Sequence, residues 1–386
     1  MIGGVMLQFD FFAWLAGIPE WIYGIIQWIY GIVSFIFYWV YDLFRWIWAT
    51  IFLPSNFMFL FRAIIFPGLI FVVMALIWAV WFTRKLWGRI QDRRGPVHLG
   101  KYGGLQLFAD AIKLIAKETI IPDNARRWMF RFLPGLLLVV VLLPFAFIPW
   151  DLEYWFIADL SVSLVLVFAF LTAVPVISLL AGWVSGSKYS LIGGFRAANN
   201  QFAAEIPLII STIGPALLAG SLSLMGIAAA QSSIWFAVLL PINLATFLVA
   251  AIASVGIFPF DAPVADSEII FGWRTEFTGI HFTLTYFAEF AEQMLYSALI
   301  VTLFLGGPIG PLTGPLAGPV NFVLKFLITF FFFVLVSSSF QRLRQDQIVH
   351  YCWKYLLPLA LLNIILIMLA IVYIPGIAAL LPLGGG

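Results

Sequence analysis

The residues best suited to chemistry in this 386-residue chain are carboxylates gathered around one stretch, PFDAPVADSEIIFGWRTEFTG, at positions 259–279. The chain is 63% hydrophobic and only 10% charged, yet six of its 18 acidic residues fall within 261–292. Carboxylates held close together with little water suppress one another's ionisation, which makes proton exchange possible near neutral pH. The acids of this region are Asp261, Asp266, Glu268, Glu276, Glu289 and Glu292.

A polar stripe continues from this stretch into an apolar segment. His281, Thr285, Glu289, Glu292 and Tyr296 follow one another at steps of four, four, three and four residues. Residues at these steps share one face of a helix. Ionisable groups at membrane depth are costly and usually face a protein interior. The spacing therefore predicts an internal polar path.

Two further charged residues, Lys325 and Glu205, are also candidates for this polar path. Lys325 lies alone in the apolar run NFVLKFLITFFFF and needs an acidic or backbone partner. A role in the path is expected for it, and a structural ion pair with a glutamate is the alternative. Glu205 follows Arg196 by nine residues in RAANNQFAAEIP, where a solvated carboxylate at a helix start is also common. Glu205 can join the other acids only if the fold brings them together.

Hydropathy places these residues in an all-α polytopic membrane protein. Mean hydropathy is +1.06, and the apolar runs are continuous, which favours helices over a barrel. The first run is crowded with Trp and Tyr and contains the near-repeat WIYGIIQ and WIYGIVS. Nine apolar segments are long enough to cross a bilayer, at about 20–50, 58–83, 129–149, 158–182, 206–229, 234–258, 283–306, 320–340 and 354–381.

Basic residues predict the orientation of these segments. The connectors at 84–131, 183–205, 259–282 and 341–354 hold 17 of the 20 Lys and Arg residues, and the opposite connectors hold none. The positive-inside rule then predicts a multi-pass protein of the cell (plasma) membrane with its large charged loops on the cytoplasmic side. The largest of these loops contains LQLFADAIKLIAKE, an amphipathic helix expected either on the membrane surface or against a partner subunit.

Composition also limits what the chain itself can carry. A single cysteine, Cys352, excludes a disulfide framework and a cysteine-ligated iron–sulfur cluster held by this chain alone. Three scattered histidines argue against a zinc or haem site. A net charge of +2 gives no indication of a nucleic-acid partner. We therefore expect no metal and no cofactor bound by this chain, and any electrons must travel through other chains.

Four sequence blocks stand out along the chain: RKLWGRIQDRRGPVHLGKYGGLQLFADAIKLIAKETIIP, AGWVSGSKYSLIGGFRAANNQFAAEIP, PFDAPVADSEIIFGWRTEFTG with FAEFAE, and SFQRLRQDQ followed by WKYLLPLALLN. In this order they resemble the H subunit of respiratory complex I, with this chain as a divergent member. The resemblance covers 58 to about 370 and implies eight family transmembrane helices over 58–386, preceded by an aromatic-rich extension over 1–57 with an extra helix. It also implies a subunit without a redox centre that forms a quinone-access chamber and the start of an acidic path coupling quinone reduction to proton pumping.

The resemblance and the polar pattern together assign residues to two sites. In such a complex quinone is the substrate and iron–sulfur clusters lie in partner subunits. The implied partners are the hydrophilic quinone-site and iron–sulfur subunits of a peripheral arm, small membrane subunits, antiporter-like subunits and lipid. The quinone-chamber candidates are Arg84, Arg93, Gly95, Pro96, Arg196, Phe277, Arg342, Arg344 and Asp346. The proton-path candidates are Glu205, Asp261, Asp266, Glu268, Glu276, Glu289, Glu292 and Lys325.

This chain lacks several charges that the family usually carries. Thr83 stands where the family has Glu, residues 254–257 replace Glu-Thr-Asn-Arg, Val264 replaces an acid and Ser337 replaces an arginine. These losses favour an alternative, the anchor subunit of a related membrane-bound hydrogenase or ferredoxin- or coenzyme-linked dehydrogenase. The retained SEIIFGWRTEFTG favours a quinone design. A stand-alone ion transporter would show internal repeats and interrupted helices, and we find no such halves.

Overall fold

The computed structural model describes residues 60–264, 266–314 and 316–373, without the side chains of residues 266 and 267. The chain divides into two units, Met1–Leu60 and Phe61–Gly386, and the described residues after Leu60 all belong to the second. The predicted extension over 1–57, with its additional span, lies outside the described residues, as does the end of the last predicted span. The predicted domain boundary at 57/58 stays a prediction.

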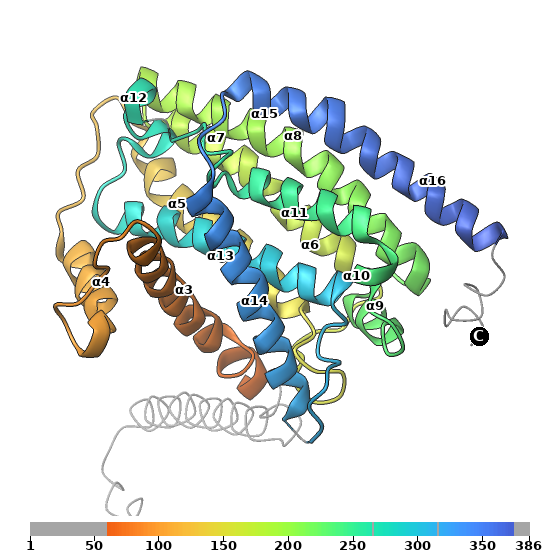
Figure 1. The fold of residues 1–386 in the computed structure, drawn as a ribbon. Coiled ribbons are helices and arrows are strands. Elements are labelled where there is room, and N and C mark those ends of the chain that lie inside the picture. The colour runs from red at the N-terminus through yellow and green to blue at the C-terminus, as the bar shows by residue number, and fades with distance from the viewer. Residues whose placement is uncertain (1–59, 265, 315, 374–386) are drawn as a thin grey trace, which may run out of the picture. The chain divides into compact units, whose positions relative to one another are not determined.

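All regular structure in the described residues is helical, which confirms the predicted all-α polytopic class (Figure 1). Seven helical segments in this part of the chain are long and apolar enough to cross a membrane. They are Leu60–Ile90, Arg127–Phe147, Ser163–Val184, Lys188–Ala219, Gly279–Phe304, Ala317–Ser339 and Gln345–Tyr373.

The span expected at 234–258 is shorter than predicted. It consists of a single turn, α10 (Phe236–Leu239), and a 15-residue helix, α11 (Pro241–Val255). Leu240 between them is non-helical, with φ −124° and ψ 55°, because the residue before a proline is disfavoured in the α conformation. Pro241 itself begins α11, where a missing N–H costs nothing.

The remaining elements, in chain order, are α3 (Leu69–Ile90), η1 (Lys101–Gly103), α4 (Gln106–Ala116), α5 (Arg127–Leu142), η2 (Leu143–Phe147), α6 (Ser163–Leu171), α7 (Ala173–Val184), α8 (Lys188–Ala219), α9 (Leu224–Ala230), α12 (Asp266–Ile269), η3 (Gly272–Arg274), α13 (Gly279–Phe304), α14 (Ala317–Ser339), α15 (Gln345–Tyr351), the π-helical turn Cys352–Leu356, and α16 (Leu357–Tyr373).

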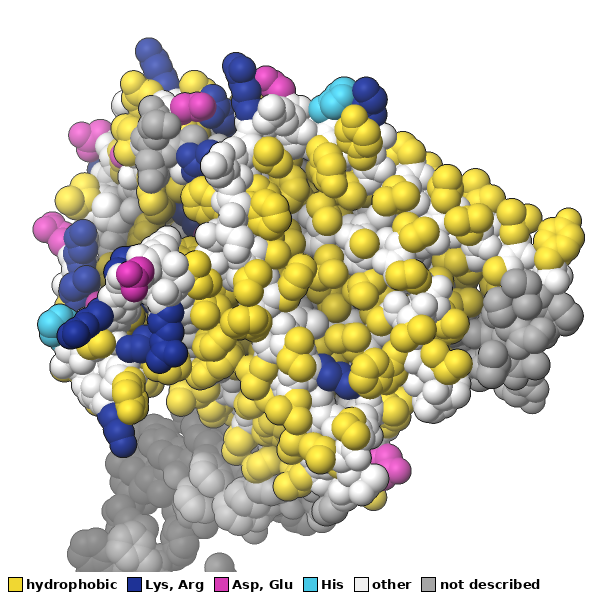
Figure 2. All heavy atoms as spheres, in the orientation of Figure 1, with side chains coloured by type: hydrophobic (Ala, Val, Ile, Leu, Met, Phe, Trp, Pro, Cys, Tyr) yellow, Lys and Arg dark blue, Asp and Glu magenta, His cyan; other side chains and the backbone are white. Residues whose placement is uncertain are grey.

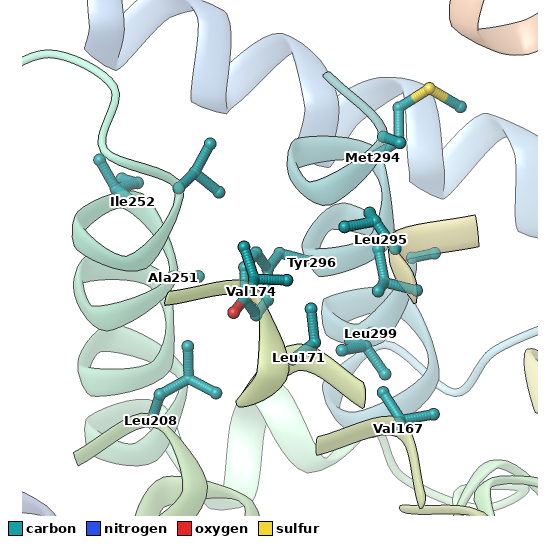
Figure 3. Close-up of a cluster of buried hydrophobic side chains, with 14 of the residues drawn as sticks. Val167, Leu171, Val174, Leu208, Ala251, Ile252, Met294, Leu295, Tyr296 and Leu299 are labelled. Atoms are coloured by element: carbon teal, nitrogen blue, oxygen red, sulfur yellow. The ribbon is translucent and has the colours of Figure 1, made fainter. Parts of the chain in front are cut away.

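Helix α13 is the centre of the described unit. It packs against α5, α14, α11 and α3, and 89% of its most apolar stretch is buried, against 61% or less in the other spans. Figure 3 shows Tyr296, Leu295 and Leu299 of α13 meeting Leu171 of α6 and Leu208 of α8. Because lipid is as apolar as these side chains, close packing rather than escape from water holds the helices together. Because most of α13 is buried between other helices, its polar stripe is enclosed, as its spacing predicts.

The outer surface of the unit is apolar on α14 and α16. Figure 2 shows this yellow face, while Lys, Arg, Asp and Glu gather at the edge where α4, α12 and α15 lie, here called the charged edge. This distribution suits a protein whose sides face lipid. The exposed apolar side chains of the two helices include Leu324, Ile328, Phe331, Leu335, Leu362, Ile365 and Leu369.

Residues 183–205 were predicted to form a connector between two spans. This prediction is wrong for residues 188–205, which are helical. Helix α8 already begins at Lys188 and runs for 32 residues, well beyond the roughly 20 needed to span a bilayer. Its first part, GGFRAANNQFAAE, holds four helix-favouring alanines and packs its small residues against α7. Arg196 and Glu205 consequently lie on one continuous helix.

Candidate functional site

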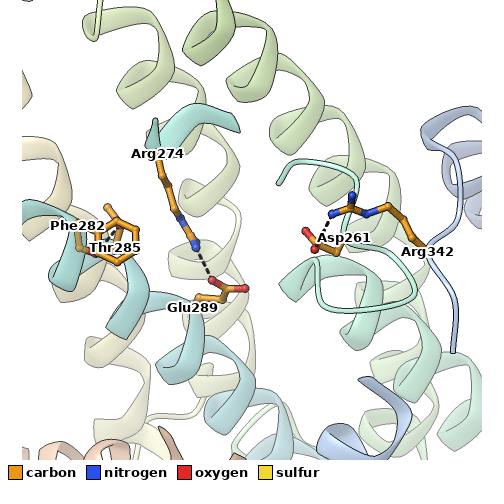
Figure 4. Close-up of polar contacts among 6 residues, drawn as sticks. All are labelled: Asp261, Arg274, Phe282, Thr285, Glu289 and Arg342. Carbon is orange, nitrogen blue, oxygen red and sulfur yellow. Dashed lines mark hydrogen bonds and ion pairs between the residues drawn. The ribbon is translucent and has the colours of Figure 1, made fainter. Parts of the chain in front are cut away.

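The loop after α11 presents Asp261 to an arginine from a distant segment. Helix α11 ends at Val255, and Gly256 adopts the left-handed conformation (φ 74°) that commonly ends helices. The backbone N–H of Leu343 donates to the Pro259 carbonyl at 2.8 Å, which fixes the 341–344 segment beside the loop. Arg342 Nη2 then donates to Asp261 Oδ2 at 2.9 Å and to the Val264 carbonyl at 2.7 Å (Figure 4).

The protonation of Asp261 is set by burial more than by its partner. Burial raises the pKa of Asp261 to about 7, and the nearby Glu289 adds to the rise, although Arg342 opposes it. A carboxyl whose pKa lies near 7 can gain or lose a proton under physiological conditions.

A second arginine–carboxylate pair lies deeper. Arg274 ends the short helix η3, whose first residue, Gly272, has φ +61° and would place a Cβ against the Pro263 carbonyl. Arg274 Nη1 donates to Glu289 Oε2 of α13 at 2.5 Å (Figure 4). The Arg274 guanidinium also lies 4.7 Å from the centre of the Trp273 ring. The Arg274 side chain is buried, so this pair is shielded from solvent.

Four carboxylates converge around these arginines. Glu292, one turn beyond Glu289 on α13, lies within electrostatic reach of Glu205, Glu289 and Arg274. Both Glu292 and Glu205 are buried. Asp261 in turn lies within reach of Glu289. We call Asp261, Glu289, Glu292 and Glu205 the carboxylate cluster; of the eight predicted path residues, these four are brought together.

A small cavity of about 40 Å³ is lined by two members of this cluster, Glu289 and Glu292. Residues of α5, α7, α8, α11 and α13 form its wall. Its polar lining is Ser178, Asn200, Gln201, Arg274, Glu289 and Glu292.

A larger polar cavity of about 430 Å³ opens at the charged edge. Arg196 of α8 pairs there with Glu268 of α12, and this hydrogen bond lowers the pKa of the exposed Glu268. Four predicted chamber residues meet in this cavity: Arg196 comes from α8, and the other three lie within 342–346. The cavity is lined by Arg196, Ala262, Glu268, Arg342, Leu343, Arg344, Gln345 and Asp346.

Other predicted chamber residues lie around the end of α3. Arg84 Nη1 donates to Asp110 Oδ2 of α4 at 2.8 Å. Lys85 Nζ donates to the Pro96 carbonyl at 2.9 Å, and the backbone of Gly95 lies against Lys85. The Arg93 side chain donates to its near neighbour Gln91, and its backbone N–H donates to the Gly88 carbonyl of α3 at 2.7 Å. These residues shape the turn after α3 and do not line the polar cavity in the described structure.

Three predicted site residues remain: Phe277, Glu276 and Asp266. Phe277 is buried and stacks on Phe130 of α5 at 4.5 Å between ring centroids. Glu276 is half-buried and forms no ion pair with any residue the structure describes. The side chain of Asp266 lies outside the described residues.

Lys325 lies beside the C-terminal end of α13, away from the carboxylate cluster, and binds backbone. Its Nζ donates to the carbonyls of Leu305 at 2.5 Å, Gly307 at 3.1 Å and Ile309, and it lies 4.7 Å from the Trp235 ring. A cation at the end of α13 complements the negative end of the helix dipole. Of the two partners expected for Lys325, the structure shows the backbone.

Two residues of the site were missed by sequence reasoning. Arg274 is the only Lys or Arg within 261–292, so its position among the six acids of that stretch was a usable signal. Asn200 gives no such signal, because it is one of three consecutive amides, Asn199, Asn200 and Gln201, and the sequence does not indicate which of them is buried.

At the positions where this chain lacks a charge that the family usually carries, the groups present form other hydrogen bonds. Ser254 shares a 2.9 Å hydrogen bond with Tyr296, and Thr83 donates to the Ala79 carbonyl of its own helix. Trp87 Nε1 donates to Ser337 Oγ at 3.2 Å, and the Val264 carbonyl accepts from Arg342. The local structure is therefore adapted to the neutral residues.

Comparison with known proteins supports the resemblance seen in the sequence. The sequence model of the NADH dehydrogenase family matches residues 61–368. The H subunit of NADH-quinone oxidoreductase from Dehalococcoides mccartyi is 40% identical over 308 residues, covering 80% of this chain and 86% of that protein.

Two other relatives agree. An H subunit of NADH-quinone oxidoreductase from Geobacter sulfurreducens is 38% identical, covering 77% of this chain and 92% of that protein. The H subunit from Anoxybacillus flavithermus is 39% identical, covering 77% and 90%. With the fold and the match over most of its length, the chain belongs to the NADH dehydrogenase family of membrane subunits, whose relatives are the H subunits of NADH-quinone oxidoreductase.

Proposed function

We propose that this chain is the quinone-chamber subunit of a proton-translocating oxidoreductase of the complex I type. The 430 Å³ polar cavity receives the quinone headgroup, and the carboxylate cluster begins the proton path. Ligand pockets typically measure roughly 300–1,000 Å³, so this cavity has a suitable size. The chain itself carries no redox centre. Electrons reach the quinone through iron–sulfur subunits of a peripheral arm, and small membrane and antiporter-like subunits receive the proton signal.

One observation carries the proposal: Arg342 belongs to both sites. Its side chain lines the polar cavity, while its guanidinium pairs with Asp261 of the carboxylate cluster. Quinone reduction places negative charge on the headgroup oxygens. That charge attracts Arg342, and any weakening of the Arg342–Asp261 pair favours proton uptake by Asp261, because an unpaired buried carboxylate is costly.

The charge balance of the cluster supports a proton-carrying role. Four carboxylates face only two arginines, Arg274 and Arg342, among the residues the structure describes. Burying uncompensated charge is unfavourable, so the cluster is most stable when some carboxyls hold protons. Moving a proton from one member to the next then keeps the total charge constant.

The orientation of the chain follows from its basic residues. The polar cavity lies at the charged edge, and the positive-inside rule assigns this edge to the cytoplasmic side of the cell membrane. In that orientation the cavity faces the peripheral arm. Lys325 lies toward the opposite side and caps α13 there.

The test is proton translocation by the assembled complex in proteoliposomes. Glu292→Gln and Glu289→Gln are expected to lower proton transport by roughly a hundredfold, since each removes an acid–base step. Glu153→Gln, an exposed carboxylate outside the cluster, is the matched control. Normal transport in both cluster variants would contradict the proton path.

The alternative, a hydrogenase or ferredoxin-linked anchor, is separated by the activity of the same preparation. The purified complex is expected to reduce a lipophilic quinone and to be blocked by inhibitors that fill the chamber. Hydrogen evolution without quinone-linked activity, with nickel-binding subunits co-purifying, would establish the alternative. The names of the relatives at 38–40% identity favour the quinone function.

A further inference from the structure

Asn200 is a buried polar side chain that the proposed path leaves unexplained. It lies on α8 between Arg196 and Glu205, and it is fully buried. Neither Oδ1 nor Nδ2 has a hydrogen-bond partner among the described residues. An unpaired buried amide group is unfavourable, so such groups are normally hydrogen-bonded to protein or water.

The surroundings of Asn200 identify what can bond to it. The side chain lines the 40 Å³ cavity together with Arg274, Glu289 and Glu292. A water molecule needs about 10–15 Å³, so the cavity holds roughly three waters. The cavity is therefore far too small for a quinone ring and large enough for a short water chain.

Polar groups for these waters are present on several sides of the cavity. Arg274 Nε is buried without a partner among the described residues, and it provides a donor. Glu289 has bonded Arg274 through Oε2, which leaves Oε1 as an acceptor. Gln201 and Ser178 complete the lining, with Oε1 and Oγ 3.4 Å apart. Each water can therefore reach the two to four partners that buried water normally has.

We propose that Asn200 holds a small water cluster that joins the Arg274–Glu289 pair to Glu292. This inference rests on the proposed proton path and deepens it. The carboxyl of one glutamate gives its proton to the nearest water, and the last water gives one of its own protons to the carboxylate of the next glutamate. Each step breaks one O–H bond and forms another, so no other reactant is needed. Asn200 does not titrate; it is a positioning residue that orients the waters.

The first experiment compares two asparagines on the same helix. Asn200→Leu keeps the approximate size of the side chain and removes both hydrogen-bonding atoms. Asn199→Leu makes the same change at the exposed neighbour and is the control. In the purified complex reconstituted in liposomes, Asn200→Leu is expected to lower kcat and proton transport roughly tenfold, with the KM for quinone unchanged. Equal behaviour of the two variants would overturn the proposal.

A further variant and one measurement keep the result interpretable. Asn200→Ser retains a hydroxyl and leaves space for another water, so it is expected to restore most of the transport that Asn200→Leu loses. A high-resolution map of the unaltered complex is expected to show ordered density within hydrogen-bonding distance of both Asn200 Oδ1 and Nδ2. A map in which protein groups alone fill this space would overturn the water site even if Asn200→Leu fails to assemble.

The glutamate variants distinguish failure of this inference from failure of the proposed function. If Glu292→Gln abolishes transport while Asn200→Leu behaves like Asn199→Leu, the path stands and the Asn200 site is wrong. If Glu289→Gln and Glu292→Gln both transport protons normally, the path itself is wrong.

Discussion

Asp261 and Glu268 lie seven residues apart in one loop region, and each pairs with one arginine, yet their acidities move in opposite directions. Asp261 is 15% exposed and Glu268 is 58% exposed. Burial outweighs Arg342 and raises the pKa of Asp261 to about 7, whereas the hydrogen bond from Arg196 lowers the pKa of Glu268. An arginine partner alone therefore does not set the charge state of a carboxyl; access to water decides whether the partner or the burial dominates.

The same contrast extends to two other pairs. Arg274 and Glu289 are the most buried of the described ion pairs, while Arg344 and Asp346 are almost fully exposed. Removing one partner of a buried pair leaves an uncompensated charge, but an exposed partner is simply hydrated. The region near α13 can therefore hold protons in defined places, and the rim of the polar cavity can change its partners freely.

The largest effect is expected from Arg274→Met. The change leaves Glu289 without its counter-ion and is expected to lower the free energy of unfolding by about 3 kcal/mol. Arg344→Met is the matched control, with an expected loss of less than about 1 kcal/mol. Thermal unfolding of the purified complex compares the two, and equal midpoints would remove the distinction between the buried and exposed pairs.

The next effect concerns the pH dependence contributed by Asp261. Its pKa is raised from 3.8 to about 7, so the folded chain binds this proton more tightly than the unfolded chain. Stability therefore falls as pH rises from about 4 to about 7. Asp261→Asn does not titrate, so its stability relative to the wild type is expected to improve across this interval. Parallel stability curves for the two proteins would show that Asp261 remains solvated.

The smallest effect is expected at the Arg196–Glu268 pair. Because the pKa of Glu268 is lowered, the pair contributes stability above the ordinary glutamate pKa, and this contribution is lost as pH falls below it. Arg196→Gln is expected to change the thermal midpoint slightly at low salt and not at all at about 1 M salt, where the screening length is about 3 Å. A salt-independent loss as large as that of Arg274→Met would mean that the pair is shielded from water.

Much of the fold was accessible from sequence because span length and apolarity are local properties. The stripe from Thr285 to Tyr296 was predicted to be enclosed, and α13 is the most buried of the described spans. Helix ends were less accessible. The polar residues of 188–205 suggested a connector, but they belong to α8, since a membrane protein can bury polar side chains inside the bundle.

Residue identity and order were enough to establish the family, the apolar spans and the concentration of acids at 261–292, because each of these is a property of the linear chain. Which acids act together became visible only in three dimensions. Glu205 on α8 joins Glu292 on α13, whereas Glu268 turns to Arg196 at the cavity rim. Electrostatic coupling depends on distance and on exclusion of water, and both arise from helix packing rather than from spacing along the chain.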